Sequence, residues 1–351
     1  MIKLLCVTGN IYPPKTGGDQ AVTNAFKLLQ DELDLHVFVL GSSPEEGSIS
    51  QFKQALPKAS FGYFNTRARD RYETVHQFCL RIKNVLHRLA NDNPGNYEIE
   101  RLLTANTERN MNIYEALNKY IVENDIDVVQ FEFASSLFWA QGITAPVKKV
   151  FVQHEINYVV KEQRLSQNCS TREKLICGIY KNREIAMQNA YDAIITLQEE
   201  DTKRLVKDGV SVPIFTSFAK VQIRDADMRD YTSVNSIDLV FVGPESHIPN
   251  KHGLLWFVSE VWDKILANTP NIKLHVIGKW SDKTVNDWAA KYRNLIFEGF
   301  VDDLVPALQE KIMIVPIYEG SGIRMKILEA ANIGVPFVSC TVGAEGLLFT
   351  S

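Results

Sequence analysis

The chain contains 351 residues, and at roughly 150 residues per domain this length predicts two domains. Hydrophobic residues make up 45% and charged residues 23% of the chain, which is enough apolar material for two cores and excludes an intrinsically disordered protein. The net charge of 38 − 42 = −4 provides no overall basic field, so no nucleic-acid partner is expected.

The cysteines and the N-terminus both indicate a cytoplasmic protein. The longest apolar run near the start, residues 4–7, is too short for a signal peptide, and no segment approaches the roughly 20 apolar residues of a membrane span. The 5 cysteines are scattered, odd in number and without metal-ligand spacing, so we interpret them as reduced thiols and expect no metal site. They are Cys6, Cys79, Cys169, Cys177 and Cys340.

Short runs rich in β-branched residues alternate with helical stretches along most of the chain. This alternation predicts an α/β fold with parallel, doubly wound sheets that helices cover on both faces. The first series of expected elements is a strand at 2–8, a helix at 19–32, and strands at 35–40, 128–133, 149–153, 193–196 and 213–217. The second series is a strand at 237–242, a helix at 254–266, and strands at 273–277, 295–298, 312–315 and 337–339.

Residues 218–236, between the two series, are polar and weakly periodic, as a linker between domains is. We therefore expect two Rossmann-like domains, 1–217 and 237–351, that face each other across a cleft.

Residues 51–120 interrupt the alternation and are expected to form a helical insertion. Val75, Phe78, Ile82 and Leu89 recur within it at helical spacing, which predicts an amphipathic helix. The segment has 11 basic and 7 acidic residues, a balance of 11 − 7 = +4. Two interpretations stay open: a solvated helical face, and a surface that binds an anionic lipid or a charged acceptor.

The first predicted strand runs into a glycine-containing loop, residues 9–18, and a helix follows. Doubly wound domains bind ligands at this position, outside the carboxyl ends of the strands. Gly17 and Gly18 lack Cβ atoms, so their backbone N–H groups can approach an anion at the helix N-terminus. The loop has neither a G-x-G-x-x-G nor a Walker pattern, so we expect no dinucleotide or P-loop site; a purely structural turn is the alternative.

A second glycine-containing loop lies between the strand at 312–315 and a helix that we expect to begin near residue 323. Gly320 and Gly322 permit a close approach of the backbone to a ligand in this loop. The N-terminus of the following helix favours an anion such as a pyrophosphate.

Charged residues follow in the same segment. Arg324 or Lys326 can add a cation beside the helix N-terminus, and Glu329 lies about one turn beyond Lys326, where it can accept hydrogen bonds from ribose hydroxyls. The alternative is an ordinary glycine-led helix with solvated charges.

Residues 319–347, EGSGIRMKILEAANIGVPFVSCTVGAEGL, resemble the donor-site signature of the large glycosyltransferase family 4, whose members retain the anomeric configuration and have the GT-B fold. The resemblance spans nearly the whole chain, and this signature is its most specific part. Further similar features are the Pro13-Pro14…Gly17-Gly18 loop, Phe241-Val242-Gly243 leading to Pro249-Asn250, Val276-Ile277-Gly278, and His154 in VQHEI.

The resemblance implies that the second domain holds a nucleotide-diphosphate sugar and that the acceptor enters from the first. Glu329 would hold the ribose and Lys326 the diphosphate. The implied catalytic residues are His154, which would lie near the transferred sugar, and Glu319, which would form hydrogen bonds with the hydroxyls of that sugar. The implied donor-binding residues are Gly17, Gly18, Gly243, Lys251, Gly320, Ser321, Gly322, Arg324, Lys326 and Glu329.

Three features depart from the family pattern. The family usually has seven residues between its two glutamates, whereas nine separate Glu319 from Glu329, and Ser321 stands at the usual first position. Pro244 stands where the family often has a cation, which leaves Lys251 for that role. The chain also ends at residue 351, where the family continues with helices, so we expect an incomplete second domain.

The implied activity is transfer of a hexosyl group from a nucleotide-diphosphate sugar to a glycan or lipid-linked acceptor in surface polysaccharide synthesis. The implied location is cytoplasmic, with peripheral contact at the inner membrane face through residues 51–120. Helix dipoles and cations can stabilise the charge of the leaving diphosphate, so no cofactor is expected. A nucleotide-sugar epimerase of similar fold and a non-catalytic GT-B binding protein are the alternatives.

Two Asp-x-Asp pairs, at 125–127 and 225–227, raise the further possibility of a metal-dependent transferase of the other major fold. The first pair precedes a buried strand and the second lies in the expected linker, so we do not expect either to bind a metal.

Overall fold

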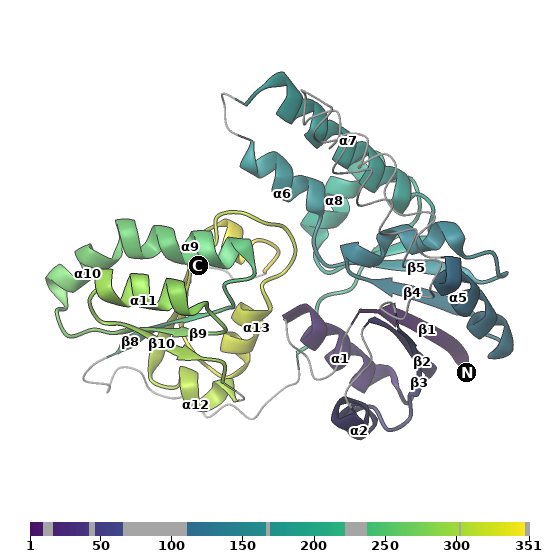
Figure 1. Cartoon of the computed structure of the whole chain (residues 1–351), viewed down its shortest axis with the longest axis horizontal. Coiled ribbons are helices and arrows are strands. Elements are labelled where there is room, and N and C mark those ends of the chain that lie inside the picture. The colour runs from purple at the N-terminus through teal and green to yellow at the C-terminus, as the bar shows by residue number, and fades with distance from the viewer. Residues whose placement is uncertain are drawn as a thin grey trace, which may run out of the picture. The chain divides into compact units, whose positions relative to one another are not determined.

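Two parallel β-sheets form the framework of the chain, one in each of two units, Met1–Phe218 and Ala219–Ser351 (Figure 1). The computed structural model describes residues 1–9, 17–41, 46–65, 111–165, 169–221, 237–301 and 303–347. Every strand pairing within these residues is parallel, and helices connect successive strands. The predicted α/β architecture with doubly wound sheets is confirmed.

The first unit contains a seven-stranded sheet in the order β3-β2-β1-β4-β5-β6-β7. Its strands are β1 (Ile2–Thr8), β2 (Leu33–Gly41), β3 (Ser60–Asn65), β4 (Val128–Glu132), β5 (Lys148–Gln153), β6 (Ala193–Thr196) and β7 (Ile214–Thr216). Its helices are α1 (Gly17–Leu29), α2 (Glu46–Ala55), α5 (Met111–Glu123), the 3₁₀ helix η2 (Ala134–Gly142), α6 (Asn157–Arg164), α7 (Thr171–Gln188) and α8 (Glu199–Asp208).

Helices cover both faces of this sheet, which is why β1 is apolar without alternation. Leu4 faces Val22 and Phe26 of α1, whereas the next residue, Leu5, faces the opposite side, where Leu117 of α5 packs. All of these side chains are buried. A strand buried on both faces therefore reads as a continuous apolar run.

The expected helical insertion at 51–120 is wrong at residues 60–65, whereas residues 51–55 lie in the helix α2. Residues 60–65 form β3, which pairs in parallel with β2 at the edge of the sheet. Its sequence, SFGYFN, is rich in aromatic residues, which favour strands, and the Phe61 ring packs against Phe52 of α2. The expected amphipathic helix at 75–89 lies outside the described residues, as does most of the expected linker.

The second unit contains a five-stranded sheet in the order β10-β9-β8-β11-β12. Its strands are β8 (Asp238–Val242), β9 (Leu274–Ile277), β10 (Leu295–Gly299), β11 (Lys311–Val315) and β12 (Phe337–Ser339). Its helices are α9 (Ile248–Glu260), α10 (Trp262–Asn268), α11 (Asp282–Lys291), α12 (Leu304–Leu308), α13 (Met325–Asn332) and the 3₁₀ helix η4 (Val342–Ala344). In Figure 1, α9 to α11 lie on one side of the strands and α12 lies on the other.

The helix expected at 254–266 begins earlier and is divided in two. α9 starts at Ile248 with Pro249 in its first turn, a position that proline tolerates because the first N–H groups of a helix have no partner within it. Val261 ends α9, and α10 follows directly. The sequence prediction began at the first strongly apolar residues and so missed the polar first turn, which contributes to the site described below.

None of the helices in the described ranges is both long enough and apolar enough to cross a bilayer.

Candidate functional site

In the second unit, the neighbouring strands β8 and β11 end at the same edge of the sheet. Gly243 follows β8 with a φ of 154°, and an added Cβ would collide with the side chain of Asn250 on α9. The Trp280 indole donates a hydrogen bond to the Gly243 carbonyl (3.0 Å), and the Asn250 amide donates to the Pro244 carbonyl (3.1 Å). The glycine therefore lets the loop after β8 close onto the first turn of α9.

The loop after β11 is built around Arg324. Gly320 and Gly322 have φ values of 114° and 77°, a region that glycine adopts without strain. The buried Arg324 guanidinium donates to the carbonyls of Ser321 (2.6 Å) and Gly322 (2.9 Å), and more weakly to that of Glu319 (3.4 Å). The side chain that the sequence suggested as a donor-binding cation thus holds the backbone of the glycine loop.

Lys326 is the lysine at the centre of this region. Its ammonium group donates to Asn250 Oδ1 (2.9 Å) and lies 4.7 Å from the centre of the Phe241 ring. Burial, reinforced by the neighbouring charge of Arg324, lowers the pKa of Lys326 to about 7, although the charge of Glu329 opposes this shift. The amino group is therefore held by a neutral amide and an aromatic ring, and neither of these partners supplies a negative charge.

Lys251, the other lysine that the sequence proposed, has a different partner. Its ammonium group pairs with Glu245 (2.8 Å), which also accepts hydrogen bonds from the Thr284 hydroxyl and the Ser281 N–H (both 2.7 Å). Burial opposes ionisation of Glu245, but these hydrogen bonds outweigh it and lower its pKa to about 2. The structure thus joins Lys251 to a carboxylate, whereas Lys326 lies beside the glycine loop.

Glu319 contacts a residue that the sequence analysis did not select. Its carboxylate accepts a hydrogen bond from Nδ1 of His252 on α9 (2.8 Å), and the Glu319 side chain is 8% exposed, compared with 45% for His252. Glu329 lies on α13 in the turn that follows Lys326, and its role in holding a ribose stays a prediction. The second unit thus brings Gly243, Gly320, Gly322, Lys326 and Glu319 to one edge of its sheet.

In the first unit, the ends of β4 and β5 bring His154 together with residues that the sequence analysis missed. His154 follows β5, and its Nε2 is 2.6 Å from Oε2 of Glu132, the last residue of β4. The imidazole stacks on the Phe133 ring with centroids 4.3 Å apart. An added Cβ on Gly18 would lie 2.6 Å from that ring, so this glycine makes room for Phe133. A direct role of Gly17 or Gly18 toward a phosphate stays a prediction.

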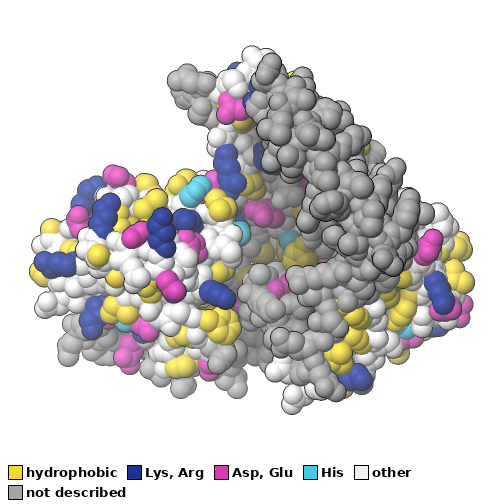
Figure 2. All heavy atoms as spheres, in the orientation of Figure 1, with side chains coloured by type: hydrophobic (Ala, Val, Ile, Leu, Met, Phe, Trp, Pro, Cys, Tyr) yellow, Lys and Arg dark blue, Asp and Glu magenta, His cyan; other side chains and the backbone are white. Residues whose placement is uncertain are grey.

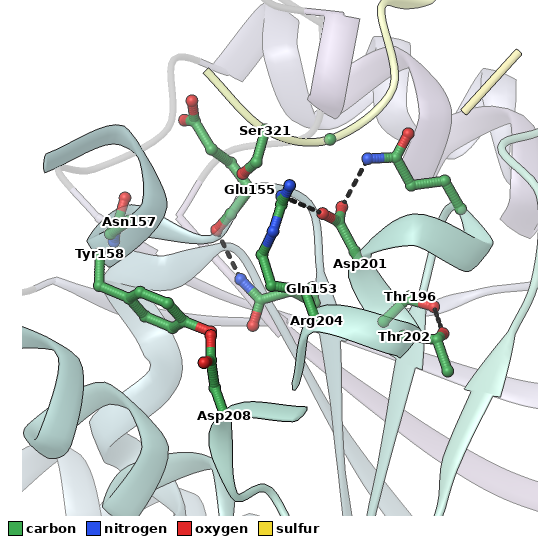
Figure 3. A network of polar contacts seen from close by, with 12 residues as sticks. Gln153, Glu155, Asn157, Tyr158, Thr196, Asp201, Thr202, Arg204, Asp208 and Ser321 are labelled. Carbon is green, nitrogen blue, oxygen red and sulfur yellow. Dashed lines mark hydrogen bonds and ion pairs between the residues drawn. The ribbon is translucent and has the colours of Figure 1, made fainter. Parts of the chain in front are cut away.

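Buried polar side chains at the ends of β5 and β6 form a second network (Figure 3). Gln153 donates to the Glu155 carbonyl (2.5 Å). Beyond β6, Gln198 donates to Asp201 (2.9 Å), and Arg204 pairs with the same carboxylate (3.5 Å). Because Gln153, Gln198 and Asp201 are fully buried, these bonds fix the ends of β5 and β6, and His154 directly follows β5.

The turn that carries His154 leads into α6, whose N-terminus is capped from another helix. Glu184 of α7 accepts hydrogen bonds from the N–H groups of Asn157 (3.0 Å) and Tyr158 (2.9 Å). Burial raises the pKa of Glu184 from 4.5 to about 7, although these two hydrogen bonds oppose the shift. Between those pH values the folded state binds more protons than the unfolded state, so stability falls as the pH rises from about 4.5 to about 7.

We therefore expect Glu184→Gln, which does not titrate, to lose this part of the pH dependence of folding. The wild type should lose up to about 3 kcal/mol of unfolding free energy from this group between pH 4.5 and pH 7. Urea unfolding at pH 5, 6, 7 and 8 measures the difference. Glu199→Gln, at an exposed position on α8, should keep the wild-type profile, and an unchanged profile in Glu184→Gln would contradict the prediction.

The missed residues share a property that explains why the sequence did not reveal them. Asn250 belonged to the Pro249-Asn250 pair that resembled the family, yet nothing in the pattern indicated that it contacts Lys326 76 residues away. Glu132 is a single acidic residue at the end of an apolar strand, which was the available signal. His252 follows the Pro249-Asn250 pair and Lys251, but nothing in that pattern indicated a contact with Glu319, 67 residues away.

Among the described residues, no group of His, Cys, Asp and Glu side chains has an arrangement that could hold a metal ion. The Asp-x-Asp pair at 225–227 lies outside the described residues. On the face of the second unit that Figure 2 shows, basic and acidic side chains are interspersed.

Part of the second unit matches a known protein family, and the fold of the whole chain is similar to solved structures. Residues 236–349 match the family model described as Glycosyl transferases group 1. This chain is similar in structure to TarM of S. aureus, which was solved as a point mutant in complex with Fondaparinux, alpha-GlcNAc-glycerol and UDP. The TM-score is 0.64 and the sequence identity 13%, and the similarity covers 100% of this chain and 88% of TarM. Sucrose-phosphate synthase from Thermosynechococcus elongatus is similar with a TM-score of 0.65 and 13% identity, over 98% and 82% of the two chains.

A relative in Klebsiella pneumoniae, described as an uncharacterized 44.6 kDa protein in the cps region, is 21% identical over 175 residues. That match spans 48% of this chain and 44% of the relative, less than half of its length. The structure therefore has the GT-B fold, and residues 236–349 are similar to the family described as Glycosyl transferases group 1.

Proposed function

We propose that the chain is a retaining glycosyltransferase that moves a hexosyl group from a nucleotide-diphosphate sugar to a glycan or lipid-linked acceptor. The similarity to a protein of a cps region supports a role in surface polysaccharide synthesis. We further propose a cytoplasmic location, with residues 51–120 as the contact to an anionic membrane surface.

The observation that carries the proposal is the position of Lys326. Its amino group lies at the carboxyl edge of the second sheet, beside Asn250 and next to a glycine loop that Arg324 holds in shape. α13 begins at Met325, so its N-terminal N–H groups contribute positive potential at the same edge. A lysine, a helix N-terminus and glycine backbone together suit a diphosphate.

The chemistry follows from where charge develops. As the bond between the sugar and the diphosphate breaks, the leaving group gains negative charge, which a protonated Lys326 and the helix N-terminus stabilise. Glu319, which accepts a hydrogen bond from His252, would hydrogen-bond sugar hydroxyls. His154 would bind the transferred sugar or the acceptor from the first unit. In this scheme the protein's own cations serve the diphosphate, and we propose that no cofactor is needed.

Calorimetric titration with UDP, GDP, ADP and their common sugar conjugates tests the proposal, followed by donor turnover with and without candidate acceptors. We expect one nucleoside diphosphate to bind, Lys326→Met to weaken it at least tenfold, and Lys264→Met, at an exposed position on α10, to leave it unchanged. Turnover without an acceptor would favour an epimerase, and binding without turnover a non-catalytic protein. Absence of binding to every nucleotide would overturn the donor site.

A further inference from the structure

The Glu132–His154 pair is more constrained than a hydrogen bond between two surface residues. The side chains of His154 and Glu132 are 12% and 3% exposed, and Oε2 of Glu132 is 2.6 Å from Nε2 of the imidazole. The other carboxylate oxygen, Oε1, accepts a hydrogen bond from the Gln130 amide (2.5 Å). Because β-strand residues two apart project to the same face, Gln130 and Glu132 support each other along β4. Both oxygens of the carboxylate therefore have defined partners.

Phe133 restricts the plane of the imidazole. Its φ and ψ of 68° and 150° lie in a region that residues other than glycine rarely adopt. This conformation carries the ring over Gly18 and against His154, with an angle of 26° between the two ring planes. Strained backbone of this kind concentrates at functional sites, where the surrounding structure holds it in place.

These contacts determine which nitrogen of the neutral imidazole carries the proton. A carboxylate only accepts hydrogen bonds, so in a neutral His154 the proton must be on Nε2. Nδ1 then carries a lone pair, and it makes no hydrogen bond to the part of the chain that the structure describes. A ligand group that meets Nδ1 of this tautomer must be a hydrogen-bond donor, which a sugar hydroxyl is and a fully ionised phosphate is not.

We propose that Glu132 is a positioning residue that keeps the proton of His154 on Nε2, so that Nδ1 accepts a hydrogen bond from a hydroxyl group of the transferred sugar or the acceptor. The assignment of the ligand group rests on the proposed function. The hold of Glu132 on His154 rests only on the contacts within the first unit.

Glu132→Gln tests the proposal because, with the Gln130 amide in its present orientation, the NH₂ group of the new glutamine cannot face Gln130. The Gln130 amide would face the carbonyl oxygen of the new glutamine, whose NH₂ group would then face Nε2 of His154. Nε2 must accept, and the proton moves to Nδ1. We expect kcat to fall about 100-fold or more, with the KM for the donor changed less than threefold, as for other histidines forced into the wrong tautomer.

A second substitution separates this effect from general damage to the site. In Gln130→Ala/Glu132→Gln the amide is free to turn its carbonyl oxygen toward Nε2, so we expect kcat to recover at least tenfold relative to Glu132→Gln. Gln130→Ala alone is the matched comparison. Glu132 still accepts a hydrogen bond from Nε2 of His154 in this variant, so we expect its kcat to fall less than tenfold, well short of the loss in Glu132→Gln. Failure of the double variant to recover, or a Glu132→Gln variant with near-normal kcat, would overturn the proposal.

Imidazole nitrogen NMR provides a readout that does not need activity. The His154 signals, assigned by their loss in His154→Gln, should show a protonated Nε2 in the wild type and a protonated Nδ1 in Glu132→Gln. The same tautomer in both proteins would overturn the hold of Glu132 on the ring. If no sugar is transferred, the proposed function fails, and this comparison still decides the role of Glu132.

Discussion

The affinity for a nucleoside diphosphate should fall about tenfold for each pH unit above pH 7 and level off below it. Lys326 has a pKa of about 7 in the free protein because burial and the charge of Arg324 disfavour its protonated form. A bound diphosphate favours the protonated form and raises this pKa, so binding above pH 7 takes up a proton. Below pH 7 the lysine is already charged in the free protein, and the slope disappears.

Titration calorimetry between pH 7 and 9.5 measures this effect, with UDP or the diphosphate that the nucleotide screen selects as the probe. The terminal phosphate has a pKa of about 6 and is fully ionised over this range, so its own titration does not contribute. At pH 8.5, buffers of different ionisation enthalpy should report uptake of about one proton per bound ligand. The nucleoside without phosphates should show no such uptake.

Three variants identify the titrating group. Lys326→Met should abolish the slope, whereas Lys264→Met should retain it. Asn250→Asp places a carboxylate where the Asn250 amide oxygen now accepts a hydrogen bond from Lys326. The lysine should therefore stay charged to higher pH, and the fall in affinity should begin at a higher pH than in the wild type. A slope that survives in Lys326→Met would assign the proton to another group.

Arg324→Ala should destabilise the protein by about 2–4 kcal/mol and weaken nucleoside diphosphate binding at least tenfold. The guanidinium donates to the carbonyls of Ser321 and Gly322, and to that of Glu319 at longer range. Its removal leaves buried carbonyls without their charged donor and releases the loop beside Lys326. The stability and affinity of Arg324→Lys should lie between those of the wild type and Arg324→Ala. Its ammonium group keeps the charge but cannot reproduce the fork of donors of the guanidinium.

Urea unfolding without ligand and calorimetry with ligand together test this prediction. Arg293→Ala removes an exposed side chain of the same unit and should change the unfolding free energy by less than about 0.5 kcal/mol. If Arg324→Ala weakens binding but leaves the ligand-free stability unchanged, the arginine contacts the phosphates directly. Equal stability of Arg324→Ala and Arg293→Ala would contradict a role in holding the loop.

The sequence predicted much of the fold because strands buried on both faces leave a local signal. The strands expected at 2–8 and 193–196 coincide with β1 and β6. It missed β3, whose aromatic residues lie in a region where helical spacing dominated the interpretation. It also shortened α9, since a first turn that contains Pro249 has no apolar period.

In the candidate site, too, the sequence predicted the features that leave a local pattern and missed those that do not. Glycine loops at strand ends, and cations after them, are local patterns, so Gly320, Gly322, Arg324 and Lys326 could be selected from the sequence. Their individual contacts could not, because a charged side chain in a motif can meet either a ligand or its own backbone. Arg324 meets the backbone carbonyls of its own loop, and Lys326 meets Asn250.

The sequence by itself determined the class of fold, the strand-end loops and the types of charge that follow them, since all of these depend on neighbours within a few residues. Tertiary structure alone decided that Lys326 meets Asn250, that His252 holds Glu319, and that Glu132 holds His154. Partners such as Glu132 and His154, 22 residues apart, or His252 and Glu319, 67 residues apart, meet only after the strands are assembled. Hydrogen bonds require atoms within about 3 Å, and that proximity comes from packing the sheet, which no local pattern encodes.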